Sequence, residues 1–385
     1  MRRAEAVVVG GGLAGMAAAF ALSSAGVQTI HVAPAAPPDR RTSALMMPAV
    51  DYLTGAGLID DPASIGHKLA GIRIIDSTER LLRAPETLFR ASEIGLEAFG
   101  WNFPNVALME SFTALKASPA TLTTVETTLT ALDRTADGTR LTLGNGEVIL
   151  ADLVVGADGK KSLVRETANF RARENGFTQA ALVCDLLLGR PLGDTSVEFH
   201  HAQGPFTLVP AGGNRANLVW IDDRRVLKDA QRAGKEHLAA LFYQKSQHLF
   251  GTVELATPTH MFMLSTLTVA TAGLDGVVLV GEAAHAFPPI GAQGLNLTLR
   301  DVADLAATLA EVDRTEPRWA EAVSRDYARR RSGDLGRTGA MVDALFRSLL
   351  IDMVPVQAAR AAGLWALKLS PQLRRQAFQF GMGQR

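Results

Sequence analysis

The sequence contains a single cysteine, Cys184, among 385 residues. One thiol excludes an internal disulfide framework and any metal site built from several cysteines. Aromatic residues are also scarce, at 6%, whereas apolar residues make up 47%, which is typical of a globular chain. Lys+Arg and Asp+Glu both number 39, so no net charge favours a nucleic-acid partner. The pair His200-His201 suggests metal binding, but adjacent strand residues face opposite ways and no third ligand is in view, so no metal is expected.

Long hydrophobic runs are missing as well. No stretch of about 18 uncharged apolar residues could span a bilayer. A strand pattern starts within a few residues of the N-terminus, which leaves no room for a signal peptide. We therefore expect a cytoplasmic protein, either free or bound peripherally at the inner membrane. Its length is comfortable for two domains.

The first 32 residues predict a strand, a glycine-rich turn, a helix and a second strand. Ala4 to Val9 is apolar and is followed by GGGLAG, which supplies Gly10, Gly12 and Gly15 of a GxGxxG pattern. In this setting the three glycines allow a tight turn, the approach of a pyrophosphate and close helix packing, which predicts dinucleotide binding. The acid expected at the end of the second strand is replaced by Ala33, so either Asp39 substitutes or the ribose is held less tightly.

Two later segments suggest further contacts to the same ligand. Arg41 either reaches a phosphate at the first turn or is a solvated loop arginine. In ADLVVGADGKKSLVR, Asp158 and Gly159 follow a buried strand. Asp158 is placed either to accept from a ribose hydroxyl or to cap the next helix, and both roles can coexist.

A third block, GEAAHAFPPIGAQGLNLTLRD, runs from Gly281 to Asp301 after an apolar run. A strand, a Gly/Pro loop and a helix start together form an anion site, because the first helical N–H groups lack internal partners. The alternative is a sharp turn that needs small residues for packing alone.

The order of the segments predicts a discontinuous arrangement. Residues 1–70, 100–175 and 270–340 are expected to form the nucleotide-binding domain. Residues 71–99 and 176–269 contain short β-like runs between turns and are expected to form an inserted antiparallel-sheet substrate domain. Residues 341–385 are expected to be a helical tail. Within it, residues 353–385 are basic and apolar, so they either lie on an anionic bilayer or pack on the body or a partner.

Taken in order, the three blocks resemble the FAD-dependent aromatic hydroxylases that have the para-hydroxybenzoate hydroxylase fold. More narrowly, DRRTSAL at Asp39 to Leu45, the N-x-x-L element at Asn105 to Leu108, and YARRRSGD at Tyr327 to Asp334 resemble the ubiquinone-biosynthesis hydroxylases. The resemblance implies an α/β fold with a Rossmann-like FAD domain of the glutathione-reductase type, an inserted antiparallel sheet and C-terminal helices. The sequence departs from the family pattern at Ala33, Glu282 and Ala292.

The resemblance also implies an activity. NAD(P)H would reduce FAD, and one oxygen atom of O2 would pass to a phenol ring, polyprenylated if the narrower match holds. His285 is either a polarising group or a helix-packing residue. Two rivals stay open, a soluble small-phenol hydroxylase and a flavin-poor, non-catalytic subunit of a biosynthetic complex. The FAD-contacting positions that the resemblance implies are Gly10, Gly12, Leu13, Ala14, Gly15, Arg41, Asp158, Gly159, Gly281, Glu282, Pro289, Gln293, Gly294, Leu295 and Asn296.

Overall fold

The computed structural model of the chain describes residues 1–78, 84–115 and 120–350, with side chains up to 344, and the tail pieces 362–363, 365–367, 369–370 and 372–376. Most of the predicted membrane-facing tail, 353–385, therefore lies outside the described residues. Within the described ranges, no helix is both long and apolar enough to cross a bilayer.

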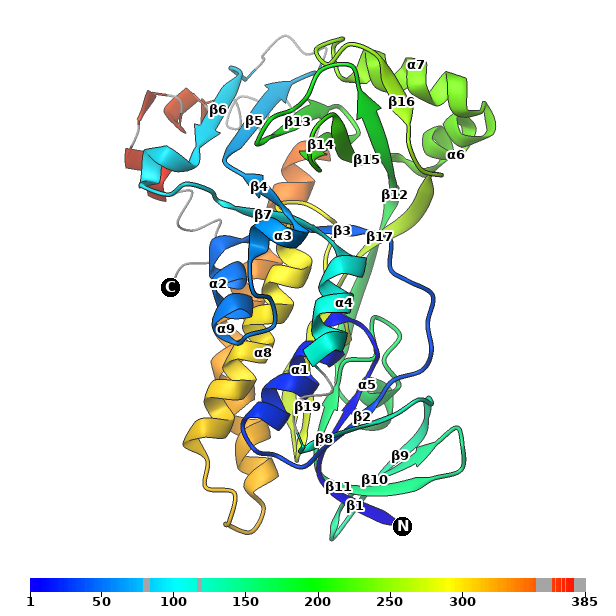
Figure 1. Ribbon diagram of the computed structural model, residues 1–385, viewed down its shortest axis with the longest axis vertical. Coiled ribbons are helices and arrows are strands. Elements are labelled where there is room, and N and C mark those ends of the chain that lie inside the picture. The colour runs from blue at the N-terminus through cyan, green and yellow to red at the C-terminus, as the bar shows by residue number, and fades with distance from the viewer. Residues whose placement is uncertain are drawn as a thin grey trace.

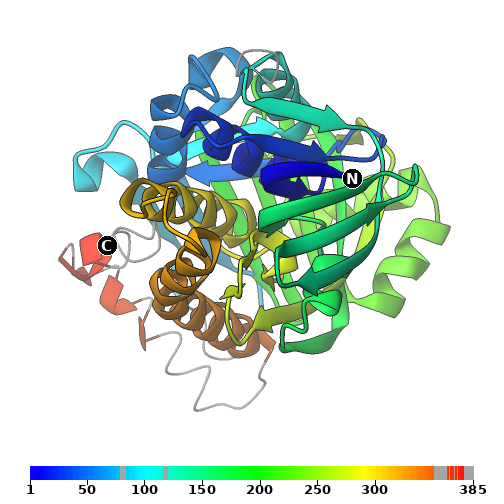
Figure 2. The ribbon, with the colours of Figure 1, turned by 90° about the horizontal axis from the view of Figure 1, so that it is seen from below.

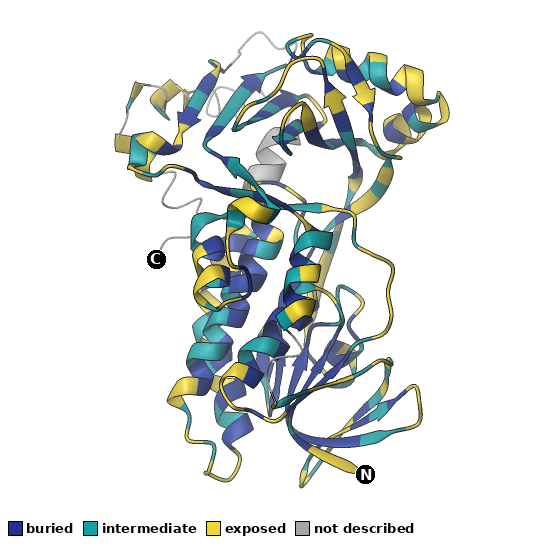
Figure 3. Ribbon diagram, viewed as in Figure 1, coloured by how far each residue is buried: buried dark blue, intermediate teal, exposed yellow. Residues whose placement is uncertain are grey.

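A first sheet, at the bottom of Figure 1, has a parallel centre in the order β19-β11-β1-β2-β8. Its central strands are apolar on both faces and are buried, as Figure 3 shows, which is typical of a parallel sheet covered by helices. Its strands are β1 (Arg2–Val9), β2 (Thr29–Val32), β8 (Leu122–Val125), β9 (Leu129–Thr135), β10 (Gly138–Leu143), β11 (Val148–Gly156), β18 (Gly273–Leu274) and β19 (Val277–Leu279).

A second sheet forms the upper part of Figure 1, in the order β20-β17-β12-β15-β14-β13-β5-β6 with β16 beside β12. Its pairs are antiparallel except β5 with β13, which are parallel, so the prediction of an antiparallel sheet is right but for that pair. Its strands are β5 (Gly71–Asp76), β6 (Thr87–Arg90), β12 (Ala172–Leu188), β13 (Thr195–His201), β14 (Gly204–Pro210), β15 (Arg215–Asp223), β16 (Val253–Leu255), β17 (His260–Val269) and β20 (His285–Ala286).

A small sheet lies between the two large ones and contains β3 (Thr42–Met46), β4 (His67–Leu69) and β7 (Gly100–Pro104). The sequence pattern predicts only loop and helix for residues 39–57, so β3 is a correction. TSALM becomes a strand because it pairs antiparallel with β7, some 58 residues later, and a local pattern does not reveal such a partner.

Helices α1, α8 and α9 pack around the first sheet, and Figure 2 shows α8 and α9 running side by side. Helix α6 was not predicted, because its sequence RRVLKDAQR is mostly polar. The helices are α1 (Leu13–Ser24), α2 (Met47–Gly55), α3 (Pro62–Ile65), α4 (Asn105–Leu115), α5 (Leu163–Thr167), α6 (Arg224–Arg232), α7 (Lys235–Lys245), α8 (Gln293–Glu311) and α9 (Trp319–Leu350), with short 3-10 turns η1 (Ala91–Ile94) and η2 (Gly281–Ala283).

Candidate active site

The three sequence blocks meet at one edge of the first sheet. Strands β1, β11 and β19 are parallel, so the loops that follow them leave at the same carboxyl edge, where open α/β sheets bind ligands. Contact is close, because a Cβ on Gly10 would lie 2.1 Å from the carbonyl oxygen of Ala157. Segments almost 150 residues apart in the chain are thus brought together as the blocks predict.

The first turn leaves a space that the chain does not fill. A Cβ on Gly15 would lie 1.9 Å from the carbonyl oxygen of Gly10, so Gly15 is required for packing, whereas a Cβ on Gly12 would meet no atom within 4 Å. Gly12 precedes α1 without a side-chain cap, which leaves the N–H groups of Leu13 and Ala14 facing outward.

His31 helps to shape this turn and was not singled out from the sequence. Its Nε2 lies 2.8 Å from the carbonyl oxygen of Gly10, and the ring is fully buried on β2. In the sequence, a histidine on a buried strand looks like an ordinary core residue, so no local pattern predicts the contact of His31 with the turn.

The N-terminus of α8 repeats the arrangement at α1. Ala292 precedes the helix with φ 54°, next to Gly291 at φ 63°, and no side chain caps the first turn. A Cβ on Gly294 would meet nothing within 4 Å, and Pro289 in the preceding loop is exposed. The predicted positions Gln293, Gly294 and Leu295 therefore carry the outward-facing N–H groups of this helix.

Asn296 has a different task from the other predicted residues of this turn. Its Oδ1 accepts from the backbone N–H of Met46 at 2.8 Å, and its Nδ2 donates to the carbonyl oxygen of Ala44 at 2.9 Å. The side chain is buried and holds β3 against the start of α8. Any contact between Asn296 and a ligand is therefore left to its backbone.

Asp158 braces the second block. Its carboxylate accepts from the hydroxyl of Ser162 and from the backbone N–H of Val164, while Ser162 itself caps α5. Arg165, to which the sequence assigns no role, is buried and donates to the carbonyl oxygens of Ala283 at 3.0 Å and Lys160 at 2.7 Å. It ties the second block to the third.

Arg41 is neither free nor simply solvated. Its Nε and Nη2 each lie 2.8 Å from the carboxylate of Asp39, which also accepts from Asn105 at 2.8 Å. Burial would raise the pKa of Asp39, but the bonds from Arg41 and Asn105 lower it. The guanidinium carbon of Arg41 lies over the ring of Phe262 on β17, 5.9 Å from its centroid. The pKa of Arg41 is raised mainly by the hydrogen bond to Asp39 and, to a smaller extent, by the charge of Glu282. Asp39 is thus committed to Arg41, which weakens the case that it replaces the ribose-binding acid.

His285 is buried in a charged network rather than presented to an open site. Its Nε2 lies 2.7 Å from Oδ2 of Asp301, and both side chains are 1% exposed. The other carboxylate oxygen, Oδ1, lies 2.8 Å from Nη2 of Arg331, which also meets Asp304 and Asp334. Burial would raise the pKa of Asp301, but His285 and Arg331 lower it. This geometry favours the packing role for His285.

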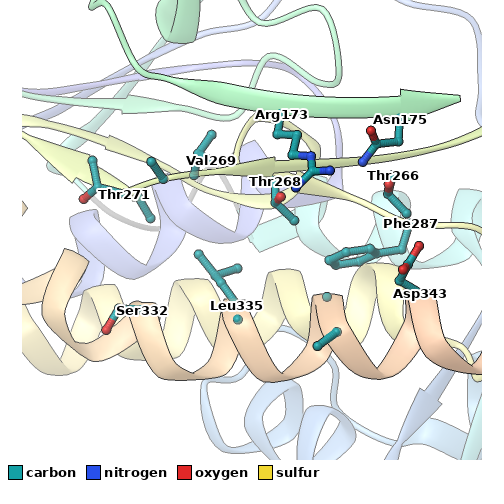
Figure 4. Close-up of a pocket in the computed structure, with 15 residues that line it drawn as sticks. Arg173, Asn175, Thr266, Thr268, Val269, Thr271, Phe287, Ser332, Leu335 and Asp343 are labelled. Carbon is teal, nitrogen blue, oxygen red and sulfur yellow. The ribbon is translucent and has the colours of Figure 1, made fainter.

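A pocket of about 350 Å³ lies behind the loop of the third block, between α9 and strands β12 and β17. Figure 4 shows Arg173 and Asn175 on one wall, Leu335 on the other and Phe287 at the loop. The Phe287 ring stacks on His285 with 5.9 Å between centroids, so this pocket borders the buried network.

The edge of the first sheet fits a dinucleotide. Two helix N-termini lack side-chain caps, and Gly12 and Gly294 leave open the space that a side chain would fill. The two helices are adjacent, since a Cβ on Gly281 would lie 3.1 Å from the Cβ of Ala14 in α1 and 3.2 Å from Cγ2 of Thr298 in α8. Such N-termini suit a pyrophosphate at α1 and an electron-rich ring edge at α8.

Comparisons with known proteins agree with this geometry. The model of the family described as FAD binding domain matches residues 3–330. The ubiquinone hydroxylase UbiL of Rhodospirillum rubrum is 32% identical over 99% of this chain and 90% of its own length. The 3-demethoxyubiquinol 3-hydroxylase of Escherichia coli is 30% identical over 98% of both chains.

A solved structure supports the fold. That of PqsL, a probable FAD-dependent monooxygenase from Pseudomonas aeruginosa, has a TM-score of 0.80 at 21% identity, covering 94% of this chain and all of that one. This likeness confirms the α/β fold, and the family model with the two relatives confirms the family resemblance stated from the sequence. The chain belongs to the FAD binding domain family, among the flavin-dependent monooxygenases.

Proposed function

We propose that this protein is an FAD-dependent monooxygenase that uses NAD(P)H and O2 to hydroxylate the ring of a polyprenylated phenol in ubiquinone biosynthesis. The structural observation that carries the proposal is the pair of uncapped helix N-termini with open glycines at Gly12 and Gly294. Similarity over nearly the whole chain to two enzymes named as ubiquinone or ubiquinol hydroxylases supports the substrate class.

The chain's own residues would bind the cofactor and orient it. The N–H groups at the start of α1 would hold the pyrophosphate, and those at the start of α8 would hold the pyrimidine edge of the flavin, where they would stabilise negative charge. Arg165 and Asn296 fix the surrounding loops against one another. When bound, FAD would supply the redox chemistry, by which two electrons from NAD(P)H and one O2 give one oxygen atom to the ring and one to water.

The loop between β20 and α8, residues 287–292, is called the flavin loop here, and it packs on an apolar part of the second sheet. Ile290 of that loop packs with Ala181, Ile221 and Leu264 of the second sheet, and Val219 borders this cluster. This buried cluster seals the loop against the second sheet, and such a seal would keep water from the reacting ring, which is the contribution expected of the protein when the cofactor carries the chemistry.

We further propose that the protein works at the surface of the inner membrane. In the described tail pieces, Trp365, Leu369 and Leu373 are 47%, 74% and 45% exposed and recur at intervals of four residues. Exposed large apolar side chains on a basic tail suit the boundary between headgroups and acyl chains. Sedimentation with anionic liposomes tests this, and a protein that stays in the supernatant regardless of lipid would refute it.

The colour of the purified protein tests the function first. A yellow protein that bleaches anaerobically with NADPH and then hydroxylates a prenylated phenol is the expected result. Activity confined to water-soluble phenols would instead support a small-phenol hydroxylase. A colourless protein that takes up no FAD would support a non-catalytic subunit, the alternative that Glu282 and Ala292 raise.

A further inference from the structure

A strip of partly buried aliphatic side chains leads away from the flavin loop. Around the buried residues Phe89, Ala91 and Phe99 it consists of Met46, Ile72, Ile74, Ile94, Leu96 and Leu367. These six side chains come from β3, β5, the η1 region and the tail. We call them the aliphatic strip.

One end of the strip adjoins the candidate active site. The backbone N–H of Met46 donates to Asn296 in the first turn of α8, at 2.8 Å, so the strip starts one hydrogen bond from the predicted flavin position. From there it follows β5, on which Ile72 and Ile74 share a face while Ile75 points into the other core.

The other end of the strip reaches the tail. Leu367 packs against it, and Arg374 holds the tail in place with Nε 2.7 Å from the carboxylate of Glu93. Arg375 donates to the backbone oxygen of the same glutamate at 3.0 Å. A hollow of about 490 Å³ lies at this junction, lined by residues 92–95 and Arg375. The strip therefore ends beside the exposed Trp365, Leu369 and Leu373.

We propose that the aliphatic strip binds the isoprenoid substituent of the substrate, with the phenol ring at the flavin loop and the chain directed toward the tail. This inference rests on the proposed function and adds to it a binding subsite for the chain. Burying each added prenyl unit against aliphatic side chains is favourable in proportion to the area removed from water. The strip thus makes affinity rise with chain length, and Leu367 borders its outer end.

The test compares two phenols, one with several prenyl units and one with none, in the holoprotein. Ile74→Gln is expected to raise KM for the prenylated phenol about tenfold, a free-energy difference of about 1.4 kcal/mol. It should leave kcat, and both constants for the unprenylated phenol, unchanged. Val226→Gln, at a 46% exposed position on α6 away from the strip, is the matched control and should leave KM and kcat unchanged for both phenols.

A tail variant keeps the test decisive if Ile74→Gln unfolds. Arg374→Ala removes the contact with Glu93 at the surface and should raise KM for the prenylated phenol alone. Equilibrium dialysis adds a readout without turnover, in which wild-type affinity grows with prenyl number. Equal effects on both phenols, or affinity independent of chain length, would overturn the inference. Failure to hydroxylate any phenol would instead overturn the proposed function, while dialysis would still decide the subsite.

Discussion

The carboxylate of Asp301 accepts a hydrogen bond from the backbone N–H of Gly281 at 2.9 Å, so the last residue of the flavin loop motif holds its first. The same oxygen, Oδ2, meets His285, and the other meets Arg331 on α9. The loop that would lie under the flavin is thereby anchored to a helix that begins 18 residues after the motif ends.

Asp301→Asn should destabilise the apoprotein by about 3 kcal/mol, because it leaves Arg331 buried with less compensating charge. Urea unfolding measures this. The control is Glu311→Gln, which removes the partner of Arg330 from a pair in which the glutamate is 65% exposed, and about 0–1 kcal/mol is expected. Equal losses in the two variants would show that the Asp301 network does not stabilise the fold.

Alanine at Gly12 should lower FAD affinity without lowering stability, whereas alanine at Gly15 should lower stability. Gly12→Ala meets no protein atom and Gly12 has φ −80°, so stability should change by less than about 0.5 kcal/mol. FAD affinity should fall by about tenfold or more, since the methyl group displaces a charged phosphate from hydrogen bonds worth roughly 1.5–3 kcal/mol. Flavin titration of the apoprotein measures the affinity.

The contrast with Gly15 is the control for that experiment. Gly15→Ala places a methyl group against the carbonyl oxygen of Gly10 and should lower the melting temperature itself. If Gly12→Ala bound FAD as tightly as the wild type, the pyrophosphate would not lie at the start of α1.

Ala292→Gly should stabilise the protein by about 1 kcal/mol, because alanine is held at φ 54° where glycine is not strained. FAD affinity should be retained or improved. Ala239→Gly within α7 is the comparison, and about 1 kcal/mol of destabilisation is expected there. Calorimetric melting of both variants checks the sign, and destabilisation by Ala292→Gly would mean that the left-handed turn is not strained.

His201 should make the fold sensitive to mild acid. Burial, and then the charge of Lys245, lower the pKa of His201 from 6.5 to about 4. The unfolded chain therefore binds a proton that the folded chain does not, so stability is complete above pH 6.5 and is lost as pH falls toward 4. His201→Gln should flatten this dependence between pH 7 and 5 in urea unfolding, and His237→Gln on the exposed side of α7 should not. Parallel curves for His201→Gln and wild type would refute the assignment.

The parts of the site that the sequence predicts correctly are those built from local backbone. The turn at Gly10 and Gly15 and the start of α8 need only a strand, small residues and a helix in succession. The turn is found as expected, and α8 starts at Gln293, two residues before the expected start near Leu295. The resemblance to a family then identifies the ligand as FAD, which spacing alone does not.

The parts that the sequence does not predict depend on partners distant in the chain. Strand β3 exists because of β7, and Asp301 depends on Arg331, 30 residues later. Arg165 appears in a recognised block, yet its role depends on the carbonyl oxygen of Ala283, which only the folded structure brings near. No local periodicity encodes these relationships, because each arises from tertiary packing.

The fate of molecular oxygen tests the central claim most directly. The purified holoprotein would be incubated with NADPH, a prenylated phenol and oxygen-18 gas, and the product analysed by mass spectrometry. We predict one labelled oxygen atom on the ring for about each NADPH oxidised. NADPH oxidation without a hydroxylated product, or a ring oxygen that comes from water, would contradict the account.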